Sequence, residues 1–301
     1  MFKTLKKRIV NIYKPTLKKR RGLYCSPKNS NNKYTCFSHD SLVKIAKAWN
    51  KNNRKSKISI KNNNTTKKLW NSIHNKLKKQ NYGEWCWIQN EFVKSLGDRE
   101  INSTFRPHTP KEWYNNKNEW LSTIDIENVM KQYEKVHKNF KFIGPVPIDF
   151  DYEYSVGNCI IDELCNIDIV DLQNKKINKI GIVFNLDKHD EEGSHWVSMF
   201  VNLGKDRVYY FDSYGEEPPK EVDVLANRLI EQGNKNNQKI KYIKNDTRFQ
   251  FKNSECGVYC MYFITQLLKG KSFNSFKKNI IRDDEMTENR GYFYSPNCSR
   301  N

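Results

Sequence analysis

The stretch DTRFQFKNSECGVYCMYFITQLLKG, residues 246–270, places a long apolar run directly after a polar loop. Nearly every side chain over 256–268 is apolar, and a helix that is apolar all round is buried on all sides. We therefore predict a core helix over 256–268. Asn253 and Ser254 are residue types that cap helices, so we expect Cys256 to lie in the first turn.

Strand patterns precede this helix along the chain. β-branched and aromatic residues, bounded by turn residues, predict strands in KIGIVFNLD (179–187), SHWVSMFVNL (194–203), RVYYFDSYG (207–215) and KIKYIKND (239–246). Residues 140–153 are extended and broken by prolines, which is typical of an edge strand or a crossing loop, and 218–233 form a helix pattern between Pro and Gly signals. Several strands with one buried helix predict an α+β fold, with a mixed central β-sheet packed by helices.

Amphipathic helix patterns fill the N-terminal part of the chain. Apolar residues recur at helical spacing over 41–53, 64–83, 84–97 and 118–137. The first three make a small helical module, and the polar, proline-containing stretch 99–110 predicts a connector after it. We therefore divide the chain into a basic arm over 1–30, a helical domain over 31–105 and a larger domain over 106–301.

The excess positive charge of the chain is concentrated in its N-terminal part. The formal net charge is +19, but residues 1–110 hold 26 Lys and Arg against 5 Asp and Glu, whereas residues 111–301 hold 27 against 29. A basic block attracts polyanions, and nucleic acid is a common one. Nucleic acid is therefore a candidate partner, with mere solubility as the alternative. A nuclear-import signal would have the same composition.

The composition excludes some classes of protein. No run of about 18 apolar residues is present, so we expect no membrane span, and we expect the chain to stay in a reducing compartment. The eight cysteines (25, 36, 86, 159, 165, 256, 260 and 298) are spread through 301 residues. This spread favours free thiols over disulfides.

Cys256 is the candidate nucleophile, because the start of a helix favours a thiolate. The alternative is a buried core cysteine, which is our interpretation of Cys260. A nucleophilic thiolate needs a base, and His195 is the one histidine that begins a predicted strand. If the strand turns back near 204–205, paired positions sum to about 408. His195 then faces Ser213 and lies beside Asp212, which can orient the imidazole.

An acyl-transfer site also needs donors for the oxyanion. The backbone N–H of Cys256 is one candidate, and the side-chain amide of Gln250 is another. An isolated glutamine has no such meaning, and its alternative is a solvent-facing residue at a strand end.

The order of these residues resembles a known family. His-Trp at 195–196, YYFDS at 209–213, then Gln250 followed by ECG at 255–257 resembles the cysteine peptidases of the SUMO-protease and adenovirus-protease type (clan CE). The resemblance implies His195 as base, Asp212 as orienting acid, Gln250 as oxyanion donor and Cys256 as nucleophile. It also implies that Trp196 shapes a narrow substrate tunnel for small residues, in an adenain-like core.

A second resemblance concerns residues 25–145. Their aromatic anchors, such as LWNSIHNKL and EWCWIQNEF, are similar to the N-terminal region of proteases from nucleocytoplasmic large DNA viruses. This implies an endopeptidase that processes structural polyproteins after Gly-Gly-like sites during virion maturation, in the virion and the host cytoplasm. The alternatives are a protease acting on ubiquitin-like (SUMO-type) conjugates and a nucleic-acid-binding protein with an idle protease-like core. The oligomeric state stays open.

A metal or cofactor is not expected. Cys25, Cys36 and His39 lack a second close pair that would complete a zinc site. We interpret Cys86, and likewise 159 and 165, as buried core cysteines.

Overall fold

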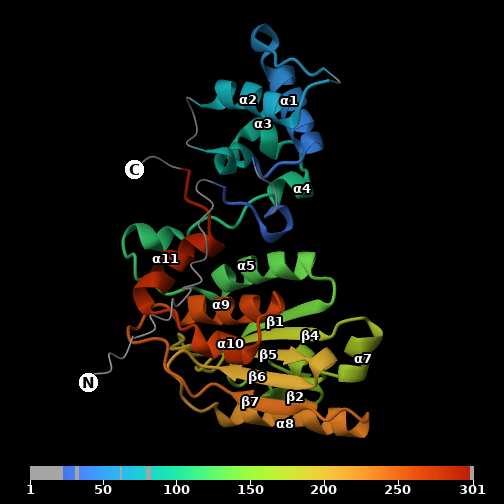
Figure 1. The fold of residues 1–301 in the computed structure, drawn as a ribbon, viewed down its shortest axis with the longest axis vertical. Helices are drawn as coiled ribbons and strands as arrows, with labels where there is room; N and C mark the ends of the chain where they lie inside the picture. The colour runs from blue at the N-terminus through green and yellow to red at the C-terminus, as the bar shows by residue number, and fades with distance from the viewer. Residues whose placement is uncertain (1–22, 31–33, 62, 79–82, 299–301) are drawn as a thin grey trace, which may run out of the picture.

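A computed structural model describes residues 23–30, 34–61, 63–78 and 83–298. The first 22 residues of the predicted basic arm lie outside the described residues. The main body is a five-stranded sheet in the order β1-β4-β5-β6-β7 (Figure 1). Its strands are β1 (Phe140–Pro147), β4 (Lys179–Asn185), β5 (Trp196–Asn202), β6 (Arg207–Phe211) and β7 (Lys241–Lys244).

The sheet is mixed, as predicted. β1 pairs with β4 in parallel and β6 with β7 in parallel, whereas β4, β5 and β6 are antiparallel. The proline-containing segment forms β1 at the edge of the sheet. An edge position suits it, because proline cannot donate a hydrogen bond to a neighbouring strand.

Two helical layers cover the sheet. α9 (Cys256–Leu268), α5 (Thr123–Val136) and α10 (Phe273–Lys278) lie on one face, and α8 (Lys220–Lys235) lies on the other (Figure 1). α9 packs against β5, and its side chains join Phe200 of β5 and Phe211 of β6 in one hydrophobic cluster. The helix is buried along almost its whole length, which is why its sequence has no polar face.

The start of α9 differs in one detail from the prediction. The helix begins at Cys256, as expected, but its N-cap residue is Glu255 and no side chain caps it. Ser254 donates instead to the Glu255 carboxylate at 3.2 Å. The prediction of a cap by Asn253 or Ser254 was therefore wrong, because the chain enters the helix one residue later than a cap at Ser254 requires.

The N-terminal region folds around its own hydrophobic cluster. Its helices are α1 (His39–Asn52), α2 (Thr66–Leu77), α3 (Glu91–Lys94) and α4 (Arg99–Asn102). The predicted third helix over 84–97 was wrong in part, because Asn90 has extended backbone angles (φ −69°, ψ 136°) and separates a 3-10 helix from α3. α4 lies inside the predicted connector. The domain boundary near residue 105 stays a prediction.

The prediction of free thiols was wrong for six of the eight cysteines. Disulfides join Cys25–Cys36, Cys86–Cys298 and Cys159–Cys165, and only Cys256 and Cys260 are free. Cys86 and Cys298 are 212 residues apart in sequence, so no local pattern indicates that they meet. The expectation of a reducing compartment rested on the absence of a long apolar segment and stays a prediction.

Several short elements had no clear sequence signal. They are β2 (Glu153–Ser155), β3 (Asn158–Cys159), α6 (Asp162–Cys165), α7 (Ile169–Asn174), α11 (Asp283–Phe293) and 3-10 segments at Pro27–Asn29, Arg54–Ser56, Lys111–Tyr114 and Leu203–Lys205. The 3-10 segment Glu84–Gln89 lies inside the predicted helix over 84–97. Among the described residues, no helix has the length and apolar character that crossing a membrane requires.

Candidate active site

The β5–β6 hairpin brings His195 to Asp212. His195 directly precedes β5, and its Nε2 lies 2.6 Å from Asp212 Oδ1. The hairpin register pairs Ser198 with Phe211, so paired positions sum to one more than predicted. The turn is longer than a two-residue turn, since Asp206 adopts a left-handed conformation after a 3-10 segment.

Backbone donors hold the Asp212 carboxylate in place. The N–H of Tyr214 donates to Oδ1 at 3.2 Å, and the N–H of Glu216 donates to Oδ2 at 3.1 Å. The tight turn that aims these donors requires Gly215, which has φ +79° and whose added Cβ would lie 2.9 Å from the Thr247 carbonyl carbon. The carboxylate is 2% exposed. Its position is therefore fixed before any substrate arrives.

The other nitrogen of His195 interacts with Cys256. An ionised carboxylate only accepts, so Nε2 carries a proton toward Asp212, and the hydrogen bond to Cys256 belongs to Nδ1. Burial lowers the pKa of His195, but the hydrogen bonds to Asp212 and Cys256 outweigh burial and raise it to about 9. The imidazole is thus a cation at neutral pH, and it lies against the sulfur.

A buried ion pair supports the start of α9. Arg290 of α11 donates from Nε to Glu255 Oε2 at 2.8 Å and from Nη2 to the Ser254 carbonyl at 3.2 Å. Its guanidinium also lies 4.0 Å from the ring centroid of Trp113. These contacts fix the residue that precedes Cys256 and neutralise its carboxylate.

Cys260 is separate from this arrangement. It is fully buried one turn further along α9, and its thiol donates to the Trp196 carbonyl at 3.3 Å. Burial raises the pKa of Cys260 well above its usual value. A buried, protonated thiol is inert, which confirms the prediction that Cys260 is a core residue.

Gln250 is fully buried and its amide orientation is defined. Its Oε1 accepts from Ser213 Oγ at 2.7 Å, so Nε2 points the other way. Nε2 donates to the Lys252 carbonyl at 2.8 Å and, over a longer distance of 3.5 Å, to the Tyr214 hydroxyl. The alternative of a solvent-facing glutamine is wrong.

Trp196 packs behind the first turn of α9. It is 5% exposed, its indole N–H donates to the Leu121 carbonyl at 3.1 Å, and a Cβ on Gly257 would lie 3.3 Å from its Cδ1. Trp196 also lines a cleft together with Pro145 and Gly193. It therefore forms part of a cleft wall next to His195.

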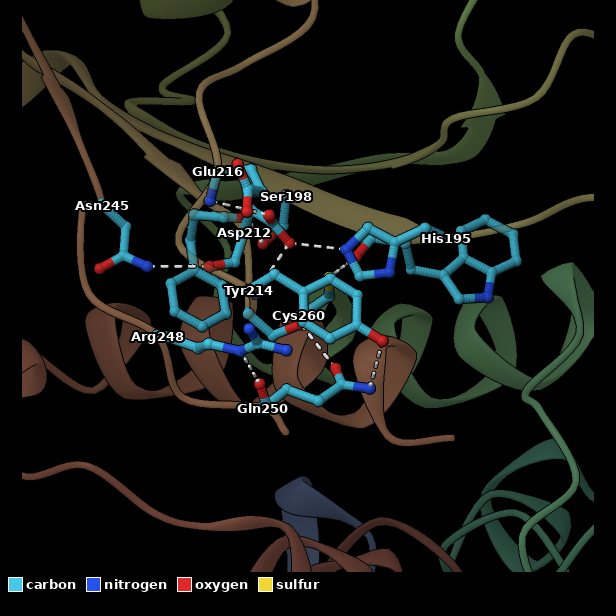
Figure 2. A network of polar contacts seen from close by, with 12 residues as sticks. His195, Ser198, Asp212, Tyr214, Glu216, Asn245, Arg248, Gln250 and Cys260 are labelled. Carbon is cyan, nitrogen blue, oxygen red and sulfur yellow. Dashed lines mark hydrogen bonds and ion pairs between the residues drawn. The ribbon is translucent and has the colours of Figure 1, made fainter. Parts of the chain in front are cut away.

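Tyr214 is a residue of this site that the sequence analysis missed. Its ring stacks on the His195 imidazole with centroids 4.7 Å apart and planes 24° apart. Figure 2 shows Tyr214 in front of His195, with its hydroxyl near the Gln250 amide and Arg248 beneath its ring. The observed register ends at the pair Ser198–Phe211, and counting on from that pair reaches Tyr214 opposite His195, so a correct count of the turn would have pointed to it.

A second cleft opens beside Tyr214. Its walls include Arg248, Phe251, Lys252 and Asn253, which belong to the loop between β7 and α9. The cleft thus follows the polypeptide that leads to Cys256. Among the described residues there is no group of three or more His, Cys, Asp or Glu side chains that could hold a metal ion.

Comparison with known proteins identifies the family. The chain is 34% identical over 278 residues, 86% of this chain and 89% of the relative, to a protein of Acanthamoeba polyphaga mimivirus named as a thiol protease. The chain belongs to the Ulp1 protease family of cysteine peptidases. The model of the Ulp1 protease family, C-terminal catalytic domain, matches residues 169–298, a range that contains all five predicted site residues.

Other family members lie further away in sequence. The cysteine protease of African swine fever virus is 26% identical over 170 residues, 55% of this chain and 58% of that protein. A crystal structure of the African swine fever virus protease superposes with a TM-score of 0.65 at 21% identity, covering 91% of this chain and 96% of that one. The fold resemblance therefore includes the N-terminal helices as well as the sheet.

Proposed function

We propose that the chain is an endopeptidase that works through an acyl-enzyme, with Cys256 as nucleophile and His195 as acid and base. The observation that carries this proposal is that the His195 imidazole is held by Asp212 at 2.6 Å and is hydrogen-bonded to Cys256 at the same time. One side chain in the right tautomer, aimed at one sulfur, is what nucleophilic catalysis by cysteine requires.

The chemistry follows from this arrangement. The Cys256 thiolate attacks the scissile carbonyl carbon, and the C–N bond breaks as His195 gives its Nδ1 proton to the leaving amine. The neutral imidazole then takes a proton from water, whose oxygen attacks the thioester and releases Cys256. Nε2 keeps its proton throughout and donates it in a hydrogen bond to Asp212. Nδ1 is therefore the nitrogen that exchanges protons.

We assign the oxyanion donors to the backbone N–H of Cys256 and the side-chain amide of Gln250. The first turn of a helix leaves its N–H groups without internal partners, and Gln250 is oriented by Ser213. Both residues are buried, and hydrogen bonds from such neutral donors act strongly in a buried site.

For the substrate, we propose bonds that follow small residues such as Gly-Gly in viral structural polyproteins. Trp196 supports this choice, because a bulky indole in the cleft wall beside His195 leaves little room for large side chains. The viral origin of the relatives supports the polyprotein. Virion maturation would place the enzyme in the virion and in the cytoplasmic sites of assembly.

Cleavage-site profiling tests this proposal. The wild type and Cys256→Ala are incubated in parallel with a Gly-Gly-containing capsid precursor and with a SUMO fusion, and the new termini are identified by mass spectrometry. We expect wild-type cleavage of the precursor after Gly-Gly and none with Cys256→Ala. Cleavage of the SUMO fusion alone would favour a deconjugating protease, and cleavage of neither would favour an idle core.

We also propose that the basic N-terminal segment binds nucleic acid. The support is its charge alone, 26 Lys and Arg against 5 Asp and Glu over residues 1–110. The affinity for duplex DNA should fall steeply from low to moderate salt and should drop on deletion of residues 1–30. An affinity that is flat in salt or survives the deletion would contradict this.

A further inference from the structure

Two arginines and an exposed phenylalanine form a cluster beside the catalytic cleft. The guanidinium carbons of Arg248 and Arg282 lie 4.9 Å and 4.7 Å from the ring centroid of Phe251. Phe251 is 59% exposed, and both arginines are exposed. We call Arg248, Phe251 and Arg282 the arginine cluster.

The cluster connects to the catalytic histidine by a continuous stack. Arg248 also lies 5.2 Å from the ring centroid of Tyr214, and the Tyr214 ring stacks on His195 (Figure 2). Arg248 and Phe251 line the cleft beside Tyr214. A ligand held by the cluster therefore lies next to the scissile bond.

The two positive charges have no carboxylate partner within the part of the chain that the structure describes. Arg248 donates to the Gln250 carbonyl at 2.8 Å, and Arg282 donates to the Arg248 carbonyl at 3.0 Å. These backbone contacts hold the guanidiniums in place without neutralising them. Two like charges on one aromatic ring repel each other, so an added anion would relieve a cost that is already present.

The nearby acids are occupied elsewhere. Asp283 is buried and accepts from the N–H groups of Phe251 and Lys252, at 2.8 and 3.1 Å. Asp284 pairs with Lys252 at 2.5 Å. Glu216 lines the same cleft but makes no ion pair with either arginine.

We propose that the arginine cluster selects substrates that carry an acidic side chain close to the cleavage site. This inference rests on the proposed peptidase function and names its specificity. A guanidinium binds a carboxylate through two parallel hydrogen bonds, and Phe251 offers its exposed ring to the stem of the same side chain. A peptide is the favoured ligand over nucleic acid, because Arg248 and Phe251 line the cleft beside Tyr214, whose ring stacks on the His195 imidazole.

Binding measured without turnover tests the inference separately from the function. Fluorescent Gly-Gly peptides with neutral flanks, or with Asp-Glu on either side of the cut, are titrated into Cys256→Ala and into the same protein carrying Arg282→Gln. We expect one of the two acidic peptides to bind about fivefold more tightly than the neutral peptide, which equals ~1 kcal/mol. We expect Arg282→Gln to abolish this preference. Arg99→Gln, an exposed arginine on α4, should leave it intact.

Cleavage by the wild type is measured on the same peptides. If acidic and neutral peptides bind equally, or Arg282→Gln leaves the preference unchanged, the inference is overturned. If Arg282→Gln weakens binding of a fluorescent DNA duplex and leaves peptide binding unchanged, the cluster is a nucleic-acid site and the inference is overturned too. A binding preference without cleavage by the wild type would support the cluster and overturn the proposed function.

Discussion

Arg290 donates to Glu255 at 2.8 Å in a pair whose side chains are 6% and 1% exposed. Glu255 is the residue directly before Cys256, so this ion pair lies next to the candidate nucleophile. An unpaired carboxylate at this point would repel a thiolate on the next residue. The pair therefore connects the stability of α11 to the electrostatics of the site.

Removing one partner of the pair should be costly. We expect Arg290→Met to lower the free energy of unfolding by about 3 to 5 kcal/mol, since it leaves a buried charge without a partner. Urea unfolding measures this. The double variant Glu255→Gln with Arg290→Met should recover part of the loss. Arg228→Met, which breaks the more exposed pair with Asp151, should cost less. Equal losses in Arg290→Met and Arg228→Met would contradict the role given to burial.

The raised pKa of His195 sets the alkaline limit of activity. Because its pKa is raised to about 9, the imidazolium that protonates the leaving amine persists through neutral pH and is lost as the pH rises through about 9. Asp212→Asn removes a charged acceptor, so the alkaline limb of kcat/KM should move down by about one pH unit or more. An unchanged limb in Asp212→Asn would show that Asp212 does not hold the imidazolium.

The oxyanion assignment predicts a pure rate effect. Gln250→Ala should lower kcat by about 10²- to 10³-fold with little change in KM, because the amide acts mainly on the charge that develops in the transition state. Gln266→Ala, on the partly buried side of α9, is the matched control and should keep its activity. A rise in KM at constant kcat would reassign Gln250 to substrate binding.

The cross-link between Cys86 and Cys298 should stabilise the protein more than the local one. Closing a loop across 212 residues restricts the unfolded chain strongly, and Cys86→Ser should cost about 5 kcal/mol, against about 2 for Cys159→Ser. The urea midpoint of each variant measures the difference. Identical midpoints for the wild type and Cys86→Ser would mean that this cross-link does not restrict the unfolded chain.

Local patterns predicted the elements that position the site. The apolar run over 256–268 predicted both ends of the helix. A helix that is buried on all sides is apolar along its whole length, so its ends coincide with the ends of the apolar run. The His195–Asp212 contact followed from hairpin geometry, but the register was wrong by one. The backbone of Asp206 adopts a left-handed conformation although the residue is not glycine, and this lengthened the turn with no glycine at that position to indicate it.

Contacts between distant segments could not be predicted in the same way. Arg290 reaches Glu255 from a helix 35 residues later, and Arg282 reaches Phe251 across a similar separation. The Cys86–Cys298 disulfide also depends on how the N-terminal helices meet the C-terminal segment. These features depend on the packing of whole elements, which side-chain spacing along one element does not encode.

Labelling of Cys256 by iodoacetamide, followed by mass spectrometry at pH 7, tests the central pairing most directly. The account predicts rapid alkylation of Cys256, no alkylation of buried Cys260, and at least about a tenfold slower reaction at Cys256 in His195→Ala, since the imidazolium sustains the reactive thiolate. Circular dichroism of His195→Ala checks that the fold is kept. Alkylation of Cys256 at the same rate with and without His195 would contradict the account.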